Sequence, residues 1–426
     1  MATTLGSPRF ALLLAIIGFI SFSLVSYIYI STIPTDASPV VKKYDHHGEK
    51  FLAYLPHSGL SNQRTELENA LLLASYLNRT LVVPPAFLGK MQGWHNGDSM
   101  NQNLNDKTEP QPWWYQCHDK KASSHGPCNA RSNYLSVPWD FLHESMANLD
   151  IPMRHIQHFS MENVQKWLTL DDDEIYNYQD TSVYSWKVCD RPKSKCPKGY
   201  DGKGHQYDTQ WTVGDLRKIP HTLIQVQGIF GANRIGVTGR EHVIKRSTIR
   251  TALAYRNPLL DAVTENIVNE LGGKHNFLAI HVRMGDWQFL GAVRKNLAIN
   301  IKFLENELAK MGCNETSTPQ CPNPPKIYLA TDAKNPRKNE NLAPLFERFP
   351  NTAIINDFQH LLVPLEKTKE IAQPPQKSVL RFMFPIIDSM VPANAKAFNG
   401  TNGSTYSKYI ERLHKVYKPT KYVAAS

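Results

Sequence analysis

The amino-acid sequence predicts an α/β protein with two domains, each built on a mostly parallel sheet. Apolar strands alternate with helical spacing near the start of the chain, and the same alternation begins again at Phe277. The chain has 426 residues, more than the roughly 250–300 residues at which a single core stops growing. We therefore expect one domain over residues 50–245 and a second over 246–426.

The first domain opens with a strand, a turn, a helix and a second strand. Lys50 to Leu55 predicts the first strand. Apolar residues then recur at helical spacing, at Leu67, Ala70, Leu71, Ala74 and Leu77. Leu81 to Val83 predicts the next strand, which stops at Pro84. Such a unit needs a right-handed crossover, so the two strands should be parallel.

Residues 90–210 interrupt this pattern. Their periodicity is poor, and they contain four of the six cysteines and six of the eight tryptophans. We interpret this stretch as a disulfide-pinned insertion, which either shapes an acceptor groove or only elaborates the fold. The sheet is expected to resume at Thr222 to Val226.

The second domain repeats the alternation of strands and helices that the first one shows. Helical spacing from Glu241 to Leu271 ends at Gly272-Gly273 and predicts a helical bridge between the domains. The strands and the last helix that follow are expected at Phe277–Val282, Lys326–Ala330, Ala353–Ile355 and Thr405–Tyr417.

An uncharged apolar run from Phe10 to Ile30 precedes the domains. It is long enough for a membrane-spanning helix and longer than the roughly 7–15 apolar residues of a cleaved signal peptide. We expect a cytosolic tail over residues 1–9, a signal anchor over 10–30 and a stem over 31–49. This arrangement is that of a single-pass type II membrane protein with a lumenal body.

The cysteines fit an oxidising compartment. They form three pairs that are close in sequence, and we expect disulfides among Cys117, Cys128, Cys189, Cys196, Cys313 and Cys321. Six cysteines allow fifteen pairings, so the connectivity stays open. Acceptor sequons for N-glycosylation occur at Asn78, Asn314, Asn399 and Asn402.

The net charge of +10 does not indicate a nucleic-acid partner. The basic residues are scattered, and no Lys/Arg stripe is interleaved with aromatic residues. The cysteine spacing does not match a zinc site either.

Three segments could hold phosphate, and the first follows the strand from Phe277 to Val282. Arg283 stands at its carboxyl end, where α/β sheets bind ligands, and a guanidinium suits phosphate oxygens. His281 is either a ligand contact or a structural histidine, and Asp286 either caps a turn or holds Arg283 or a ribose. Asp332 follows the next strand and is expected to accept hydrogen bonds from ribose or base, with a turn cap as the alternative.

The other two segments are helix starts. Gly59 leads into the first helix, which Ser61 or Asn62 could cap, and a second helix opens at Ser404-Thr405-Tyr406. Unpaired N–H groups at the positive end of a helix dipole suit a diphosphate, although each could also be an ordinary cap. Together the three segments indicate an enzyme that uses a nucleotide sugar.

Two acidic features are interpreted as structural. Asp171 and Asp173 form an Asp-x-Asp, which can hold a metal on a diphosphate, but no strand ends there and we expect a surface loop. Asp388 is expected to be a solvated surface acid.

The ordered set of motifs resembles the GDP-fucose protein O-fucosyltransferase superfamily. The motifs are Ser58-Gly-Leu-Ser-Asn-Gln63, His281-Val-Arg-Met-Gly-Asp286, Ala330-Thr-Asp332, and Gly400-Thr401 with Ser404-Thr-Tyr-Ser407. The resemblance covers about Phe51 to Tyr417. It implies a GT-B architecture, with two Rossmann-like domains facing a cleft that binds GDP-fucose, and metal-independent transfer with inversion at the anomeric carbon.

The resemblance also implies roles for individual residues. Arg283 would stabilise the departing β-phosphate, because without a metal the protein itself must offset that charge. The remaining donor contacts would come from His281, Asp332, Gly59, Asn62, Ser404, Thr405 and Tyr406.

The sequence departs from the family pattern at two positions. Many members have a second basic residue where Met284 stands, and some relatives place a glutamate before the first glycine turn, where this chain has His57. His57 is therefore the candidate general base, with Asp286 or a water relay as alternatives.

The expected function is the transfer of fucose from GDP-fucose to a Ser or Thr hydroxyl of a protein in the secretory pathway, in the Golgi rather than the endoplasmic reticulum. The expected partners are the nucleotide-sugar donor, a protein or glycan acceptor and the membrane, with no nucleic acid, no cofactor and no metal. Alternatives are another nucleotide sugar, a glycan acceptor, or a non-catalytic lectin-like protein.

Overall fold

The computed structural model divides the chain into two compact units, Met1–Asp45 and His46–Ser426. It describes residues 47–89, 93–95, 98–108, 133–157, 159–182, 185–190, 207–231, 234–236, 238–285, 287–313, 321, 323–366 and 379–418. The predicted tail, the membrane span and most of the stem lie outside these residues, as do Asp286, Cys117, Cys128, Cys196 and Asn314. Within the described ranges, no helix combines the length and apolar character that crossing a bilayer requires.

The first sheet has five parallel strands in the order β5-β2-β1-β9-β6. The strands are β1 (Phe51–Tyr54), β2 (Thr80–Val83), β5 (Met153–His155), β6 (Ile175–Tyr178) and β9 (Leu223–Val226). All residues of β1, β2 and β9 are buried, as expected for a parallel sheet with both faces covered. The three strands predicted in this domain are therefore confirmed.

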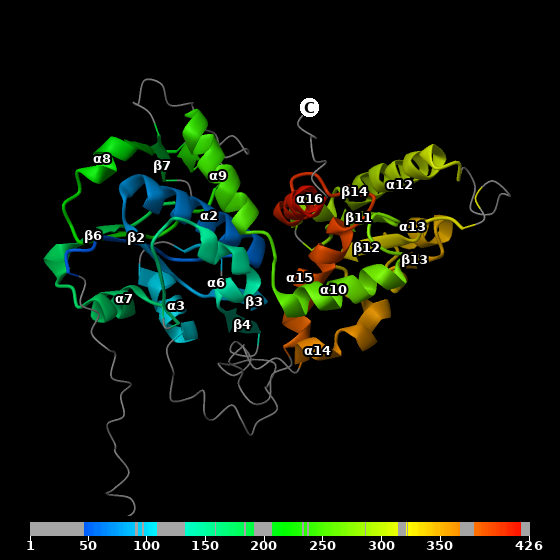
Figure 1. The fold of residues 1–426 in the computed structure, drawn as a ribbon, viewed down its shortest axis with the longest axis horizontal. Coiled ribbons are helices and arrows are strands. Elements are labelled where there is room, and N and C mark those ends of the chain that lie inside the picture. The colour runs from blue at the N-terminus through cyan, green and yellow to red at the C-terminus, as the bar shows by residue number, and fades with distance from the viewer. Residues whose placement is uncertain are drawn as a thin grey trace, which may run out of the picture. The chain divides into compact units, whose positions relative to one another are not determined.

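Helix α2 (Leu60–Leu77) connects β1 to β2 and completes the predicted unit (Figure 1). It begins well before the apolar spacing at Leu67, directly after the Gly59 turn, and ends at Asn78 with a left-handed φ of 52°. Burial extends almost around the helix and includes five polar residues, Gln63, Arg64, Glu66, Glu68 and Asn69. Polar groups in such a position require partners.

The predicted insertion over residues 90–210 is not separate from the domain, because β5 and β6 belong to the five-stranded sheet. Both are short, and β5 is an exposed edge strand without apolar alternation, so periodicity could not reveal them. Two small sheets accompany them, formed by β7 (Trp186–Cys189), β8 (Thr209–Thr212) and β10 (Ile235–Gly236), and by β3 (Ala86–Gly89) with β4 (Tyr134–Val137).

The helices of this first lobe are α2, α3 (Asp98–Thr108), α6 (Trp139–Leu142), the 3-10 helix η1 (Glu144–Asn148), α7 (Met161–Leu168), the 3-10 helix η2 (Asp172–Glu174), α8 (Val213–Arg217) and α9 (Arg240–Ala252).

The predicted helical bridge is two helices, α9 and α10 (Pro258–Glu270). Helix α9 packs on α2 of the first lobe, whereas α10 packs on α15 (Leu380–Ala393) of the second. The predicted boundary at residue 245 falls inside α9. The lobes divide between the two helices, where Asn257 caps α10 by accepting from the N–H groups of Leu259 and Leu260.

The second sheet has four parallel strands in the order β13-β12-β11-β14. They are β11 (Leu278–Val282), β12 (Ile327–Thr331), β13 (Thr352–Ala353) and β14 (Ala397–Asn399). The strand predicted at Ala353–Ile355 is shorter than expected, because Ile355 begins a 3-10 helix. The last helix, α16 (Thr405–Tyr417), has the predicted bounds.

The other helices of this lobe are α11 (Trp287–Leu290), α12 (Val293–Lys310), η4 (Pro336–Lys338), α13 (Ala343–Arg348), η5 (Ile355–Leu361) and α14 (Val363–Glu366). One apolar core continues from the first sheet and α2 through α10, α15 and α16 to one face of the second sheet. A smaller core lies on the other face of that sheet, beneath α12 and α13. The two lobes thus share their main core and pack as one unit.

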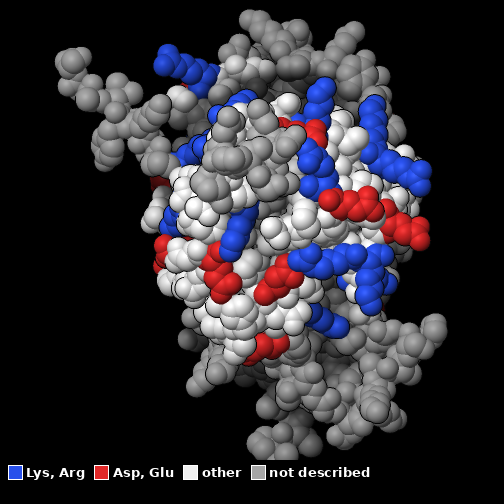
Figure 2. Space-filling view, turned by 90° about the vertical axis from the view of Figure 1, so that its right-hand side faces the viewer, with Lys and Arg blue, Asp and Glu red and all other residues white. Residues whose placement is uncertain are grey.

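Charges of both signs are mixed on the surface. On the face shown in Figure 2, Lys and Arg side chains alternate with Asp and Glu side chains, and the residues described there form no continuous basic stripe.

The disulfide prediction is confirmed for Cys313 and Cys321, which are bonded to each other. Cys189 is also disulfide-bonded. Among the predicted glycosylation sites, Asn78 and Asn402 are exposed. Asn399 is half-buried in β14, and its side-chain amide donates to Oδ1 of Asn300 at 2.7 Å, so glycosylation there would cost this contact.

Candidate active site at the carboxyl ends of the two parallel sheets

Arg283 directly follows β11 and reaches the carboxyl edge of the second sheet, as predicted. Its backbone N–H donates to Oγ1 of Thr401 at 2.9 Å, and Nη1 lies 3.2 Å from Oδ2 of Asp332. The Arg283 side chain is 30% exposed. The backbone is thus held in place while the guanidinium keeps a face open to an anionic ligand.

Asp332 follows β12 and fixes the loop that carries Arg283. Its Oδ1 accepts from the N–H of Met284 at 2.7 Å, and its Oδ2 accepts from the N–H of Gly285 at 2.8 Å. A Cβ at position 285 would collide with Oδ2, so only glycine allows this approach. Both carboxylate oxygens are used by the chain itself, which favours a positioning role over the expected ribose contact.

His281 is the second predicted donor residue, but its side chain is buried, with 1% of the residue exposed. Its Nδ1 lies 2.6 Å from Oγ of Ser407, which also accepts from the N–H of Thr401. The Thr401 hydroxyl in turn donates to the carbonyl of His281 at 3.0 Å. These contacts join β11 to the start of α16, so the structure favours the structural alternative for His281.

Burial, reinforced by the nearby Arg283 charge, lowers the pKa of His281 to about 3. Burial lowers the pKa of His143 to about 3 as well, although the Ala254 carbonyl opposes this. Both imidazoles are therefore neutral in the folded protein and protonate near pH 6.5 in the unfolded chain. Their stabilising contribution is complete above about pH 6.5 and is lost as the pH falls toward 3.

We therefore expect the free energy of unfolding to fall with decreasing pH below about 6.5, by up to about 1.4 kcal/mol per pH unit for each histidine. Urea denaturation at a series of pH values measures this slope. His143→Gln should reduce this slope by the contribution of about one proton taken up on unfolding. His360→Gln, which changes a histidine whose side chain is 62% exposed, should not reduce it. An unchanged slope in His143→Gln would contradict the prediction.

The third predicted segment opens α16. Ser404 caps the helix by accepting from the N–H of Ser407 at 3.3 Å, and it is buried. The hydroxyl of Tyr406 donates to the carbonyl of Pro385 at 2.6 Å. Thr405 faces the other lobe, and its Oγ1 donates to Oδ1 of Asn62 at 3.2 Å.

The start of α2 differs from the predicted cap. The capping residue is Gly59, without a side-chain hydrogen bond, and neither Ser61 nor Asn62 has this role. Asn62 lies in the first turn instead and contacts Thr405. The two predicted anion-binding helix starts, one from each lobe, therefore meet.

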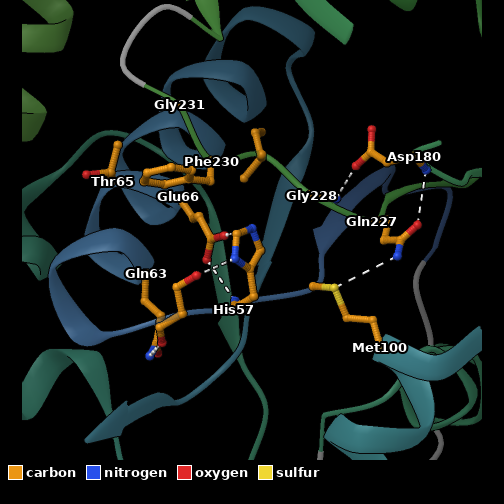
Figure 3. A network of polar contacts seen from close by, with 12 residues as sticks. His57, Gln63, Thr65, Glu66, Met100, Asp180, Gln227, Gly228, Phe230 and Gly231 are labelled. Atoms are coloured by element: carbon orange, nitrogen blue, oxygen red, sulfur yellow. Dashed lines mark hydrogen bonds and ion pairs between the residues drawn. The ribbon is translucent and has the colours of Figure 1, made fainter. Parts of the chain in front are cut away.

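His57 follows β1 at the carboxyl edge of the first sheet and is 2% exposed. Its Nε2 lies 2.7 Å from Oε1 of Glu66, which is the distance of an ion pair, and its backbone N–H donates to Oε2 at 3.1 Å (Figure 3). Its Nδ1 lies 2.8 Å from Oγ of Ser58. The imidazole is thus enclosed between two partners.

Glu66 is the residue that the sequence analysis missed. Burial raises the pKa of its carboxyl, and the contacts with His57 oppose that shift. Glu66 is one of five polar residues buried in α2, so the sequence carried no signal that distinguished it, although a fully buried carboxylate requires a partner.

Asp180 and Gln227 extend this polar group along the same edge, after β6 and β9 (Figure 3). Asp180 accepts from the N–H of Gly228 at 2.7 Å and from Oγ of Ser185 at 2.6 Å. Burial raises the pKa of Asp180, and Arg234 is the largest opposing influence.

The two acidic features have different outcomes. Asp171 and Asp173 are exposed and precede β6 at the amino edge of the sheet, so the predicted surface position is confirmed, although the segment is the 3-10 helix η2 and not a loop. Asp388 is not a surface acid. It is 6% exposed, it accepts from the hydroxyl of Tyr328 at 2.7 Å, and burial raises its pKa well above the usual range. Helix α15 packs on β12 there and excludes water.

Among the residues that the structure describes, no three His, Cys, Asp or Glu side chains gather as a metal site would require. Two parallel α/β lobes, with an accessible arginine at one carboxyl edge and a carboxylate–imidazole pair at the other, define the class of α/β enzymes that bind anionic ligands at sheet edges.

The chain belongs to the GDP-fucose protein O-fucosyltransferase family, whose family model matches residues 156–417. Membership assigns the chain to the glycosyltransferases. The matched residues include Arg283, Asp332 and the start of α16, whereas His57 and the Gly59 turn precede them.

Individual relatives are similar to this chain over different lengths. O-fucosyltransferase 30 from Arabidopsis thaliana is 66% identical over 38 residues, a match that spans 9% of this chain and 8% of that relative. The structure of POFUT1 with GDP-fucose has 12% identity and a TM-score of 0.40, over 86% of this chain and 94% of that one. NodZ alpha-1,6-fucosyltransferase, soaked with GDP-fucose, has 13% identity and a TM-score of 0.38, over 86% and 92%.

Proposed function

We propose that the protein transfers fucose from GDP-fucose to a Ser or Thr hydroxyl of a protein, with inversion at the anomeric carbon and without a metal. The observation that carries the proposal is Arg283, held at the carboxyl end of β11 by Thr401 and Asp332 within the residues that match the family. Its partly exposed guanidinium suits the β-phosphate of a nucleotide diphosphate sugar.

The reaction is a substitution at the anomeric carbon. The acceptor oxygen attacks from the side opposite to the phosphate, the bond from carbon to the β-phosphate oxygen breaks, and GDP departs with the electron pair. Arg283 stabilises the charge that develops on the β-phosphate, and the start of α16 with Thr405 adds donors to the same anion. His57, as part of the enclosed group on the first sheet, supplies the base.

The proposed setting is the secretory pathway. The apolar run from Phe10 to Ile30 supports a single-pass type II membrane protein, and the Cys313–Cys321 disulfide supports an oxidising lumen. We place the protein in the Golgi rather than the endoplasmic reticulum. Microscopy of the full chain tests the organelle. Protection of the body from external protease in sealed vesicles tests whether it lies in the lumen.

The donor is tested by measuring nucleotide release from GDP-fucose, GDP-mannose and UDP-sugars by the full chain, with and without EDTA. Water serves as the acceptor, so no protein substrate needs to be known. We expect release from GDP-fucose alone, at the same rate in EDTA. A preference for a UDP-sugar, or loss of activity in EDTA, would contradict the proposal, and failure of the folded protein to bind any nucleotide would favour the lectin-like alternative.

A further inference from the structure

Ser58 occupies an unusual backbone position between β1 and α2. Its φ is +65°, in the left-handed region that residues other than glycine seldom adopt. Gln63 fixes this turn, because its side-chain amide donates to the carbonyls of Ser58 at 2.8 Å and Phe87 at 3.0 Å. Backbone strain that the surrounding structure maintains often marks a functional position.

The Ser58 hydroxyl is the outer member of a row of three polar groups. Its Oγ lies 2.8 Å from Nδ1 of His57, and Nε2 of the same ring lies 2.7 Å from Oε1 of Glu66. Figure 3 shows the His57 ring against the Glu66 carboxylate. A carboxylate, an imidazole and a hydroxyl in this order form the arrangement in which a histidine takes a proton from a hydroxyl and the carboxylate stabilises the charged ring.

Ser58 is the least buried residue of this row. Glu66 is fully buried and His57 is 2% exposed, whereas Ser58 is half-buried. The imidazole therefore has no direct access to an acceptor, although it is the candidate base. Ser58 supplies the missing connection between them.

The position of the turn also fits. Asn62, four residues beyond Ser58, accepts from Thr405 at the start of α16, and α16 is tied through Ser407 to the end of β11, which Arg283 follows. The turn that carries Ser58 thus lies beside the helix start to which the donor phosphate is assigned.

We propose that the Ser58 hydroxyl relays the acceptor proton to His57 during fucosyl transfer, an inference that rests on the proposed function. As the acceptor oxygen bonds to the anomeric carbon and GDP leaves, the acceptor proton moves to Ser58 Oγ. The Ser58 proton moves at the same time to Nδ1 of His57. The products are the fucosylated acceptor, GDP and an imidazolium opposite Glu66, which later loses its proton to solvent.

The charged and titratable groups around His57 favour this step. Glu66 from α2 and Asp180 after β6 are the acidic neighbours, and both interact electrostatically with the imidazole. The other titratable groups nearby are Arg234, before β10, and Tyr54 on β1. The Arg234 guanidinium donates to the carbonyls of Phe230 and Trp186. The Glu66 carboxyl thus contacts the ring that must accept the proton, and Asp180 adds a smaller electrostatic influence.

The test measures GDP release from GDP-fucose by the full chain, with water as the acceptor, across a pH series. Ser58→Gly removes the hydroxyl but adopts a positive φ without strain, so it separates proton transfer from backbone effects. We expect kcat to fall about 100-fold with the KM for GDP-fucose within about twofold of wild type. Thr65→Val, which removes a hydroxyl beside Glu66 that bonds only to the Ser61 carbonyl, is the matched control and should keep the wild-type rate.

Glu66→Gln tests the inner end of the row. The carboxylate favours the protonated ring, so its removal should lower kcat and move the acid limb of the pH–rate profile to lower pH. A structural role would change the melting temperature but leave this limb in place.

The outcomes distinguish the relay from the function on which it rests. Wild-type kcat and an unchanged pH profile in Ser58→Gly, or an unmoved acid limb in Glu66→Gln, would overturn the relay while leaving the fucosyltransferase intact. If the wild-type protein itself releases no GDP from GDP-fucose, the proposed function fails and the relay fails with it.

Discussion

Replacing Arg283 with alanine is expected to lower kcat for GDP release by about 10³-fold while the protein stays folded. The guanidinium stabilises the negative charge that develops on the departing phosphate. Removing one such donor from other enzymes lowers kcat by about 10²–10³-fold, and we expect a donor with a full positive charge to lie at the upper end of that range. In the folded state the variant loses the pair with Asp332, in which both side chains are more than a quarter exposed, and such a pair is worth about 0–1 kcal/mol.

Two further variants sharpen this test. Arg283→Lys keeps the charge but not the forked donors and should retain intermediate activity. Arg348→Ala removes an exposed arginine at the end of α13, just before β13 and hence at the amino edge of the same sheet, and should behave as wild type. Turnover within a fewfold of wild type in a folded Arg283→Ala protein would refute the assigned role.

Replacing Glu68 with alanine is expected to give the largest loss of stability, about 3 kcal/mol. Glu68 lies on α2 with a side chain that is 3% exposed, 2.7 Å from Nε of Arg250 on α9 and 2.9 Å from Nη1 of Arg412 on α16. Burial alone would raise the pKa of Glu68, but Arg412, Arg250 and Arg64 outweigh it and lower the net pKa. The carboxylate is therefore charged and balances several guanidiniums.

Its removal leaves those guanidiniums without a counter-charge at the junction of the two lobes. Breaking a buried pair costs about 3–5 kcal/mol, and the lower end applies because Arg250 and Arg412 are 40% and 25% exposed. Arg64 is the most affected, since burial already lowers its pKa to about 10 and its guanidinium stacks 3.8 Å from the ring centre of Tyr409.

Urea denaturation and calorimetry measure this loss. Glu411→Ala removes the same charge from an exposed position next to Arg412 and should change the free energy of unfolding by no more than about 0.5 kcal/mol. Glu68→Gln keeps the volume and should lie between the two. If Glu68→Ala is as stable as Glu411→Ala, the charge balance does not hold the lobes together.

Local pattern was sufficient for the elements that are buried on both faces. Strands β1, β9 and β11 appear in the sequence as mainly apolar runs, interrupted only by Gln225 in β9 and His281 in β11, because parallel strands covered by helices have no polar face. Strands β5 and β6 are partly exposed and lack such a run, so the sheet was predicted with too few strands.

The sequence by itself determined that two parallel sheets exist, that Arg283 stands at the end of a buried strand, and that a helix begins after Ser404. These features depend on neighbouring residues only, through burial periodicity and helix capping. The contact of Asn62 with Thr405 joins residues 343 positions apart, and no local pattern encodes it.

Only the tertiary structure decided which polar side chains became partners. It enclosed His57 between Glu66 and Ser58, used both oxygens of Asp332 to hold the Arg283 loop, and buried Asp388 against Tyr328. The physical reason is that a buried polar group must find a partner wherever the fold brings one close, and that choice depends on packing between segments distant in sequence.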